Sequence, residues 1–212
     1  MVLGLAVSAK ALPVWSTDYI SGVTANSDRP SRDTWVVSDI TNQSGLSDSQ
    51  GDDGFKETHA AGAPGNAWIS GFSKATWISF DFPGTDSYYV DDMYVWNFNQ
   101  SATRGLHEIS IWYSNDATTK DNGTWTKLGD YDLQMGSFNT SETYTDVISF
   151  DTNVKWVKFL DQSATAHNDY DTGIDTHGEG EDGLSEVAFF TPEPATVAIL
   201  GLGSIALLRR RR

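Results

Sequence analysis

The stretch WISFDFPGTDSYYVDDMYVWNFNQSATRGLHEISIWYSND, residues 77–116, decides the fold class. Its first segment alternates in polarity, so that Ile78, Phe80 and Phe82 share one face, as in a strand with one side buried. The segment 107–114 repeats this alternation, and residues that favour turns separate the two segments. A period of two residues, interrupted in this way, predicts β-strands joined by turns.

Strand-like runs of the same kind extend over most of the chain. They lie at residues 33–40, 75–82, 88–98, 107–114, 124–133, 143–150, 154–160 and 184–190. The composition agrees with strands and turns, because the chain has 8 Trp, 8 Tyr, 10 Phe and 19 Gly. Regularly spaced strands without long helices favour an all-β sandwich or barrel.

The charge distribution excludes some classes of partner. The formal net charge is −15, and the last four residues are all Arg, so the rest of the chain has 10 basic against 29 acidic residues. Such a body is repelled by nucleic acid and by anionic lipid headgroups, whereas it suits cation binding or neutral glycans. The chain has no cysteine, which excludes disulfides, a thiol nucleophile and thiolate metal sites.

Three segments differ in composition. Residues 1–11 are interpreted as a signal-peptide remnant, since small residues follow an apolar run where a signal peptidase cuts; the alternative is an ordinary first strand. Residues 12–190 form the expected β-sandwich domain, interrupted by long polar stretches at 41–66 and 161–183. Loops of this length are usually functional. Residues 191–212 form a separate tail.

The tail, TPEPATVAILGLGSIALLRRRR, combines a Pro-Glu-Pro turn, an apolar run and an arginine cluster. The run from Pro194 to Leu208 is uncharged for 15 residues, which is short for a membrane span of about 20 residues. Arg209–Arg212 would hold the end of this run at the cytoplasmic face. The pattern predicts a single C-terminal hydrophobic helix that enters a membrane transiently; a weak permanent anchor and a core helix are the alternatives.

The order of these parts resembles the PEP-CTERM sorting signal of Gram-negative bacteria. The matching residues are Pro192, Glu193, Pro194, Arg209, Arg210, Arg211 and Arg212. The resemblance implies export, transient insertion in the inner membrane and cleavage of the tail by an exosortase, with a signal peptidase acting at the other end. The protein is then expected at the cell surface or in the extracellular matrix of a biofilm-forming bacterium.

A series of short motifs also runs through the body. In order, they are WISFDF, Asn97-Phe98-Asn99, Arg104-Gly105, Tyr113-Ser114, Trp125 and Glu186. This order resembles the discoidin, or coagulation-factor type C, domain and the related family 32 carbohydrate-binding modules. The resemblance implies an eight-stranded jelly-roll β-sandwich of the galactose-binding-like class, in which loops at one end hold any ligand.

The same resemblance implies one structural Ca²⁺. This ion binds carboxylate and carbonyl oxygens. The matching residues are Glu186 in the last strand and Ser47, Asp48, Asp52 and Asp53 in the early loop. The alternative for Glu186 is an ordinary carboxylate that faces solvent.

A glycan site needs an aromatic face for stacking and directional hydrogen-bonding groups beside it. The candidates for hydrogen bonding flank one loop and are Asn97, Asn99, Arg104 and His107. The candidates for stacking, Trp68 and Trp125, flank other loops. As alternatives, Arg104 makes an internal salt bridge and the asparagines close a turn.

Catalytic motifs are absent from the sequence. It has no G-x-S-x-G, no H-E-x-x-H and no phosphate-binding loop. We therefore interpret the chain as an exported, non-enzymatic β-sandwich that binds glycan or exopolysaccharide. The alternatives are a structural matrix protein without a specific ligand and a glycan-active hydrolase or lyase, whose paired carboxylates the many acidic residues could supply.

Overall fold

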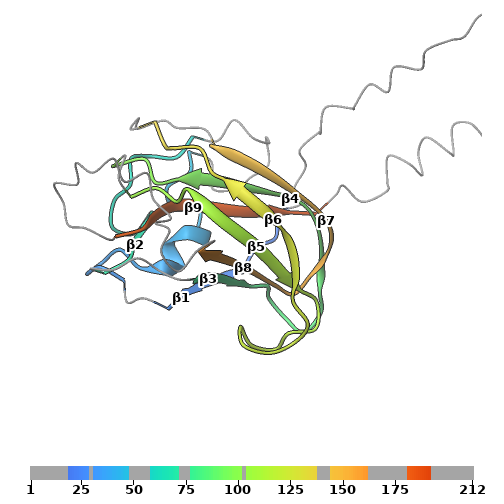
Figure 1. The fold of residues 1–212 in the computed structure, drawn as a ribbon. Helices are drawn as coiled ribbons and strands as arrows, with labels where there is room; N and C mark the ends of the chain where they lie inside the picture. Colours follow the sequence, from blue (N-terminus) through green and yellow to red (C-terminus); the bar gives the residue numbers. More distant parts are fainter. Residues whose placement is uncertain are drawn as a thin grey trace, which may run out of the picture.

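Two antiparallel β-sheets face each other in the body of the protein (Figure 1). The computed structural model describes the following residues: 19–28, 31–47, 58–71, 77–101, 104–137, 144–161 and 181–191. These residues form nine strands and one short 3₁₀ helix, and each strand pairs only with antiparallel neighbours. The all-β jelly-roll prediction is confirmed.

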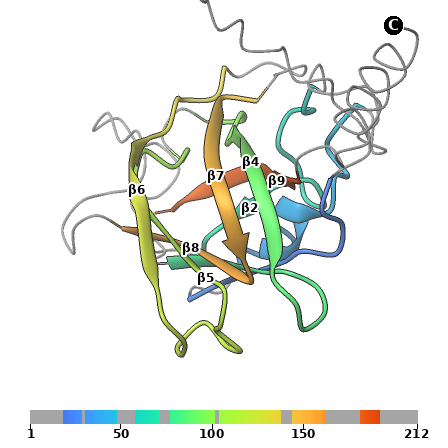
Figure 2. The same ribbon diagram turned by 90° about the vertical axis from the view of Figure 1, so that its right-hand side faces the viewer.

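The strand order brings distant parts of the chain together. The five-stranded sheet runs β1 (Thr24–Ser27), β3 (Trp77–Asp81), β8 (Trp156–Asp161), β5 (Glu108–Ser114) and β6 (Thr126–Asp132). The four-stranded sheet runs β2 (Trp68–Ile69), β9 (Gly183–Phe190), β4 (Tyr88–Asn97) and β7 (Asp146–Val154). Figure 2 shows β4 and β7 side by side, with the 3₁₀ helix η1 (Val37–Thr41) at one side of the sandwich.

The core forms where the inner faces of the two sheets meet. Ile78, Phe80 and Phe82 are at most 3% exposed, as their alternation predicts. Phe80 and Phe82 in or next to β3 contact Phe189 of β9, with ring centroids 5.4 and 4.9 Å apart. These edge-to-face contacts join the two sheets and add to the burial of apolar area.

An irregular step in the pairing of β4 with β7 accompanies a change in which side chains of β4 face the core. Between Val90 and Asp92, two steps along β4 match three steps along β7, from Thr152 to Ser149, so the extra residue stands in β7. Val90 before the bulge and Met93 after it both have no exposed surface in the core cluster, although strict alternation would place them on opposite faces. The bulge accompanies this change of face, because it locally increases the twist of the paired strands.

The outer face of the four-stranded sheet holds a second aromatic cluster. Tyr94 and Trp96 of β4 and Phe190 of β9 are each at most 8% exposed. Tyr19 and Tyr144 contact them edge-on. This face is therefore covered rather than exposed to solvent, and Glu186, which pairs with Trp96 across the strands, lies beneath the same cover.

The predicted strand at 33–40 is wrong. Asp33 has a φ of 49°, in the left-handed region, and Trp35 N donates to Arg32 O at 2.9 Å, so the chain turns here and then enters η1. The sequence interpretation also missed β1 and β2. The first lacks β-branched and aromatic residues except Thr24, and the second has only two residues, so neither shows a clear period.

Among the described residues, no helix is both long and apolar enough to cross a membrane. The expected C-terminal helix lies outside these residues, as do residues 1–11 and most of the acidic stretch 161–183.

Candidate functional site

Strand β4 ends at Asn97, whose side chain is completely buried and holds the connection to β5. Its amide nitrogen donates to the carbonyls of Leu106 at 2.6 Å and Gln134 at 2.8 Å. Its amide oxygen accepts from the backbone N–H groups of Phe98 and Leu106, at 2.9 and 2.8 Å. Both ends of the amide are thus used to close the loop, as in the alternative given for the asparagines, and a ligand contact by Asn97 stays a prediction.

Asn99 performs a similar task for another segment. Its oxygen accepts from Gly62 N at 2.8 Å, and its nitrogen donates to Ala60 O at 3.0 Å. The side chain is 1% exposed. Asn99 therefore ties the segment before β2 to the end of β4, and its predicted ligand role stays a prediction.

Arg104 lies in a cluster of three charged side chains. Its guanidinium is 2.9 Å from Glu181 Oε2, and the side chains are 8% and 2% exposed. Arg32 reaches the same carboxylate at 2.8 Å, and one third of its side chain is exposed. The internal salt bridge that the sequence left as an alternative for Arg104 is therefore present. Among the described contacts, two guanidinium groups share one carboxylate, and Arg32 is the one whose side chain reaches the surface of this acidic protein.

Trp35 stands in the same turn as Arg32. The backbone N–H of Trp35 donates to Arg32 O at 2.9 Å. Its half-buried ring contacts Phe98, with centroids 6.0 Å apart. We call Arg32, Trp35, Arg104 and Glu181 the arginine corner. It combines an accessible guanidinium with a partly accessible aromatic ring, the two kinds of group that hold a sugar by hydrogen bonding and stacking.

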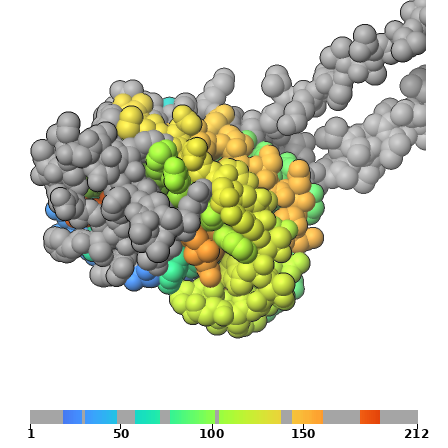
Figure 3. Space-filling view, viewed as in Figure 1, coloured from blue at the N-terminus to red at the C-terminus, as the bar shows by residue number. Residues whose placement is uncertain are grey.

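The predicted stacking platforms lie elsewhere. Trp68 in β2 has no exposed surface and belongs to the core cluster, and its role as a stacking platform stays a prediction. Trp125 is the last residue of the loop that joins β5 to β6. This loop forms the yellow-green projection at the bottom of Figure 3. Lys158 Nζ lies 4.2 Å from the centre of the Trp125 ring. Trp125 is therefore partly covered, and it stands at the other end of the sandwich from Arg104.

The position of His107 is different from that of the asparagines. It is half-buried and directly precedes β5. Its imidazole lies near the carboxylates of Glu108 and Asp132. Arg104 and His107, two of the four predicted hydrogen-bonding residues, both lie near the loops at this end of the sandwich.

A second place of interest surrounds Glu186, which is completely buried rather than facing solvent. Gln43 N, in the turn after η1, donates to Glu186 Oε1 at 3.3 Å. Asn42 in this turn donates through Nδ2 to Asp39 Oδ1 at 3.1 Å. Two buried carboxylates, from Asp39 and Glu186, are thus bonded to adjacent residues of one turn.

Asp39 supplies a test of whether a cation fits this place. Its Oδ2 makes no hydrogen bond among the described residues, and the side chain is 7% exposed. Burial raises the pKa of Asp39, although backbone hydrogen bonds at Val36 and Gly65 act in the opposite direction. A buried carboxylate oxygen without a donor is unfavourable unless a proton or a cation compensates it. The oxygen donors of Asp39 and Glu186 therefore fit Ca²⁺.

The other predicted calcium ligands do not all join this place. Ser47 Oγ accepts from Thr58 N at 3.2 Å, so it holds the two arms of the early loop together. Asp48, Asp52 and Asp53 lie outside the described residues.

Asp39, Arg32 and Glu181 are not among the site residues predicted from the sequence. Asp39 lies within the expected strand at 33–40, and Glu181 lies in the long polar stretch at 161–183. Arg32 had one available signal, because basic residues are scarce in this chain.

Comparisons with known proteins match two parts of the chain, the C-terminal segment and the β-sandwich body. Residues 190–212 match the family model described as the PEP-CTERM protein-sorting motif. No curated protein matches the chain by sequence.

Solved structures resemble the body. The CBM32-1 module from a family 31 glycoside hydrolase of Clostridium perfringens has a TM-score of 0.51 at 11% identity, over 82% of this chain and 97% of that module. The family 32 carbohydrate-binding module of C. perfringens NanJ, solved with galactose, has a TM-score of 0.49 at 11% identity, over 82% and 98% of the two chains. The chain therefore carries a PEP-CTERM sorting motif at residues 190–212, C-terminal to a jelly-roll body with the fold of family 32 carbohydrate-binding modules.

Proposed function

We propose that this protein is a non-enzymatic glycan-binding protein of the cell surface or extracellular matrix. The sorting motif implies export, and the fold is that of a class of carbohydrate-binding modules. The observation that carries the proposal is the arginine corner, where Arg32 is one third exposed beside the half-buried ring of Trp35. The ligand we expect is an exopolysaccharide made by the producing bacterium.

The arginine corner supports this role through preorganisation. Glu181 fixes the guanidinium groups of Arg32 and Arg104 at 2.8 and 2.9 Å, so little side-chain freedom remains to be lost when a ligand binds. Fixed donors beside an aromatic ring favour binding because the entropy cost is met during folding. Arg104 is therefore assigned a positioning role, and Arg32 contacts the sugar.

Affinity gel electrophoresis with the purified exopolysaccharide tests the proposal. We expect the full-length protein to be retarded, and Arg32→Ala and Trp35→Ala to bind at least about tenfold more weakly. Lys127→Ala is the matched control for charge, since Lys127 is an exposed base that pairs with Asp130 in β6. Unchanged retardation of both corner variants would exclude this site. No retardation of the unmodified protein, in calcium-containing buffer, would favour the structural matrix protein.

We also propose one structural Ca²⁺ at Asp39 and Glu186. The support is the orphaned Oδ2 of Asp39 and the shared turn at Asn42 and Gln43. A bound Ca²⁺ would compensate two buried negative charges, and these residues would hold the turn after η1 against β9. Asp48, Asp52 and Asp53 remain predicted ligands.

Processing at both ends completes the proposal. An exosortase would cleave the tail near Pro192-Glu193-Pro194, and a signal peptidase would remove the first residues. Mass spectrometry of the protein recovered from the producing cells would show both mature ends. An intact Arg209–Arg212 in the recovered protein would contradict cleavage of the tail.

Catalysis is tested on the same polysaccharide. The non-enzymatic assignment predicts no release of reducing ends or unsaturated sugars by the full-length protein. Release of either product that one Asp or Glu substitution abolishes would favour a hydrolase or lyase instead.

A further inference from the structure

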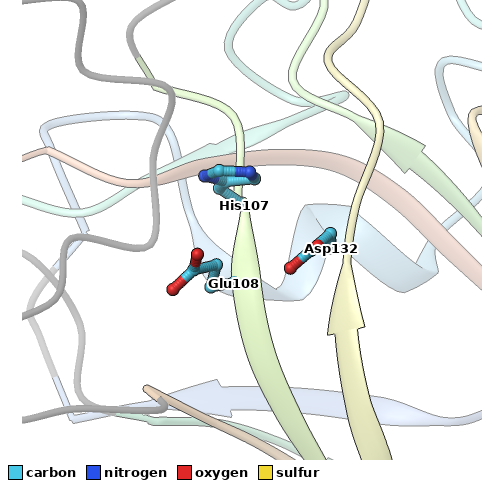
Figure 4. Close-up of side chains that lie close together, drawn as sticks. All are labelled: His107, Glu108 and Asp132. Atoms are coloured by element: carbon cyan, nitrogen blue, oxygen red, sulfur yellow. The ribbon is translucent and has the colours of Figure 1, made fainter.

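Three potential metal ligands from two paired strands meet at the edge of the five-stranded sheet. His107 directly precedes β5, Glu108 begins it and Asp132 ends β6 (Figure 4). One ligand atom of each residue lies within 4.8 Å of the ligand atoms of the other two. This separation allows all three to reach one ion after small changes in side-chain rotamer.

The strand register gives these residues an energetic reason to bind a cation. Glu108 and Asp132 are direct partners across β5 and β6, and like charges in this position destabilise a sheet. Among the residues that the structure describes, neither carboxylate makes a hydrogen bond or ion pair. By contrast, Asp130 on the same strand pairs with Lys127 Nζ at 2.7 Å and accepts from Ser110 Oγ.

The donor types indicate which cation fits. Imidazole nitrogen suits Zn²⁺, Cu²⁺ and Ni²⁺, whereas Ca²⁺ and Mg²⁺ prefer oxygen throughout. One nitrogen and two carboxylate oxygens also form a set of three protein ligands, which leaves a further position for water or another ligand. Asp132 is exposed, so that position is accessible from solvent.

We propose that His107, Glu108 and Asp132 bind a divalent transition-metal ion, with Zn²⁺ as the best match, at the junction of β5 and β6. This site is separate from the Asp39–Glu186 place in both location and chemistry. It joins the start of β5 to the end of β6, which is the edge strand of this sheet among the described residues. Bound metal would therefore hold the edge strand to the sheet.

Isothermal titration calorimetry of the full-length protein with ZnCl₂ tests the site after treatment with a chelator. We expect one site whose affinity falls at least about tenfold in His107→Ala and in Asp132→Asn. Asp86→Asn is the control, since it removes the same charge from an exposed turn. Glu186→Gln should leave Zn²⁺ binding unchanged. A Zn²⁺ affinity that stays within twofold in both site variants would overturn the proposal.

Two further measurements keep the test independent of overall charge and folding. NMR of the histidine ring nitrogens should show a Zn²⁺-dependent shift of one signal, and this signal should be missing in His107→Ala. Hydrogen exchange of the β6 amides should slow when Zn²⁺ is added to the unmodified protein but not when it is added to Asp132→Asn. A variant that is folded by circular dichroism and still shows the slowing would contradict the assignment.

Discussion

The guanidinium of Arg104 and the carboxylate of Glu181 form an ion pair at 2.9 Å in which both side chains are almost completely buried. Arg104 lies in the connection between β4 and β5, and Glu181 lies two residues before the start of β9. Gly183 N donates to Arg104 O at 2.5 Å, so backbone and side chain join the same two segments. This pair fixes the end of the sandwich to which the arginine corner belongs.

Removing Arg104 should destabilise the protein strongly. We expect Arg104→Ala to lower the free energy of unfolding by about 3–5 kcal/mol, because it leaves a buried carboxylate with less compensation. Arg32→Ala should cost about 1 kcal/mol or less, since that side chain is one third exposed. Urea unfolding followed by tryptophan fluorescence measures both. Equal losses for the two variants would show that the burial of Arg104 does not matter.

The stability should fall as the solution becomes mildly acidic. Burial lowers the pKa of His59 below its ordinary 6.5, and hydrogen bonds at Ala60 and Asn66 oppose this shift only in part. The neutral ring is thus favoured in the folded state. The stabilisation is complete above pH 6.5 and is lost as the pH falls from there through the lower pKa of the folded state.

Urea unfolding between pH 7.5 and pH 5 measures this loss, with His59→Gln as the variant that lacks the titrating group. The pH dependence should be flatter in the variant. Asp39 does not imitate the effect, because its raised pKa makes protonation stabilise the folded state. An equally steep loss in the variant would assign the effect to other groups.

Gly45 should not tolerate a methyl group. A Cβ built at Gly45 would lie 2.1 Å from His59 Nε2, and the His59 side chain is completely buried. We expect Gly45→Ala to cost about 1–3 kcal/mol in thermal or urea unfolding. In a His59→Ala background the same substitution should cost much less, since the ring is gone. A cost that does not depend on His59 would contradict this explanation.

Calcium should raise the melting temperature of the unmodified protein at millimolar concentration. A ligand at 100 times its dissociation constant stabilises the folded state by about 2.7 kcal/mol. Asp39→Asn should remove most of this response and should itself be stabilising in the presence of a chelator, because it removes a buried charge. Differential scanning calorimetry measures both effects.

Asp33→Asn, in an exposed position, is the control for the calcium experiment. A calcium response that survives in both Asp39→Asn and Glu186→Gln would place the ion elsewhere. No response in the unmodified protein would remove the calcium proposal.

The sequence by itself determined the class of fold and the sorting motif. Alternation at Ile78, Phe80 and Phe82 requires only that one face of a strand be buried, so it can be seen without knowing the partner strand. The order of Pro-Glu-Pro, apolar run and arginine cluster is likewise a property of consecutive residues, and the family match at 190–212 confirms it.

The roles of the polar residues became visible only in the folded protein. Asn97 and Arg104 are residue types that often bind ligands. Their partners in the folded protein, Gln134 and Glu181, come from other parts of the chain. The direct pairing of Glu108 with Asp132 depends on a strand register that a bulge after Ile111 shifts. A hydrogen bond or ion pair needs two groups within a few ångströms, and this proximity is created by folding rather than by sequence spacing.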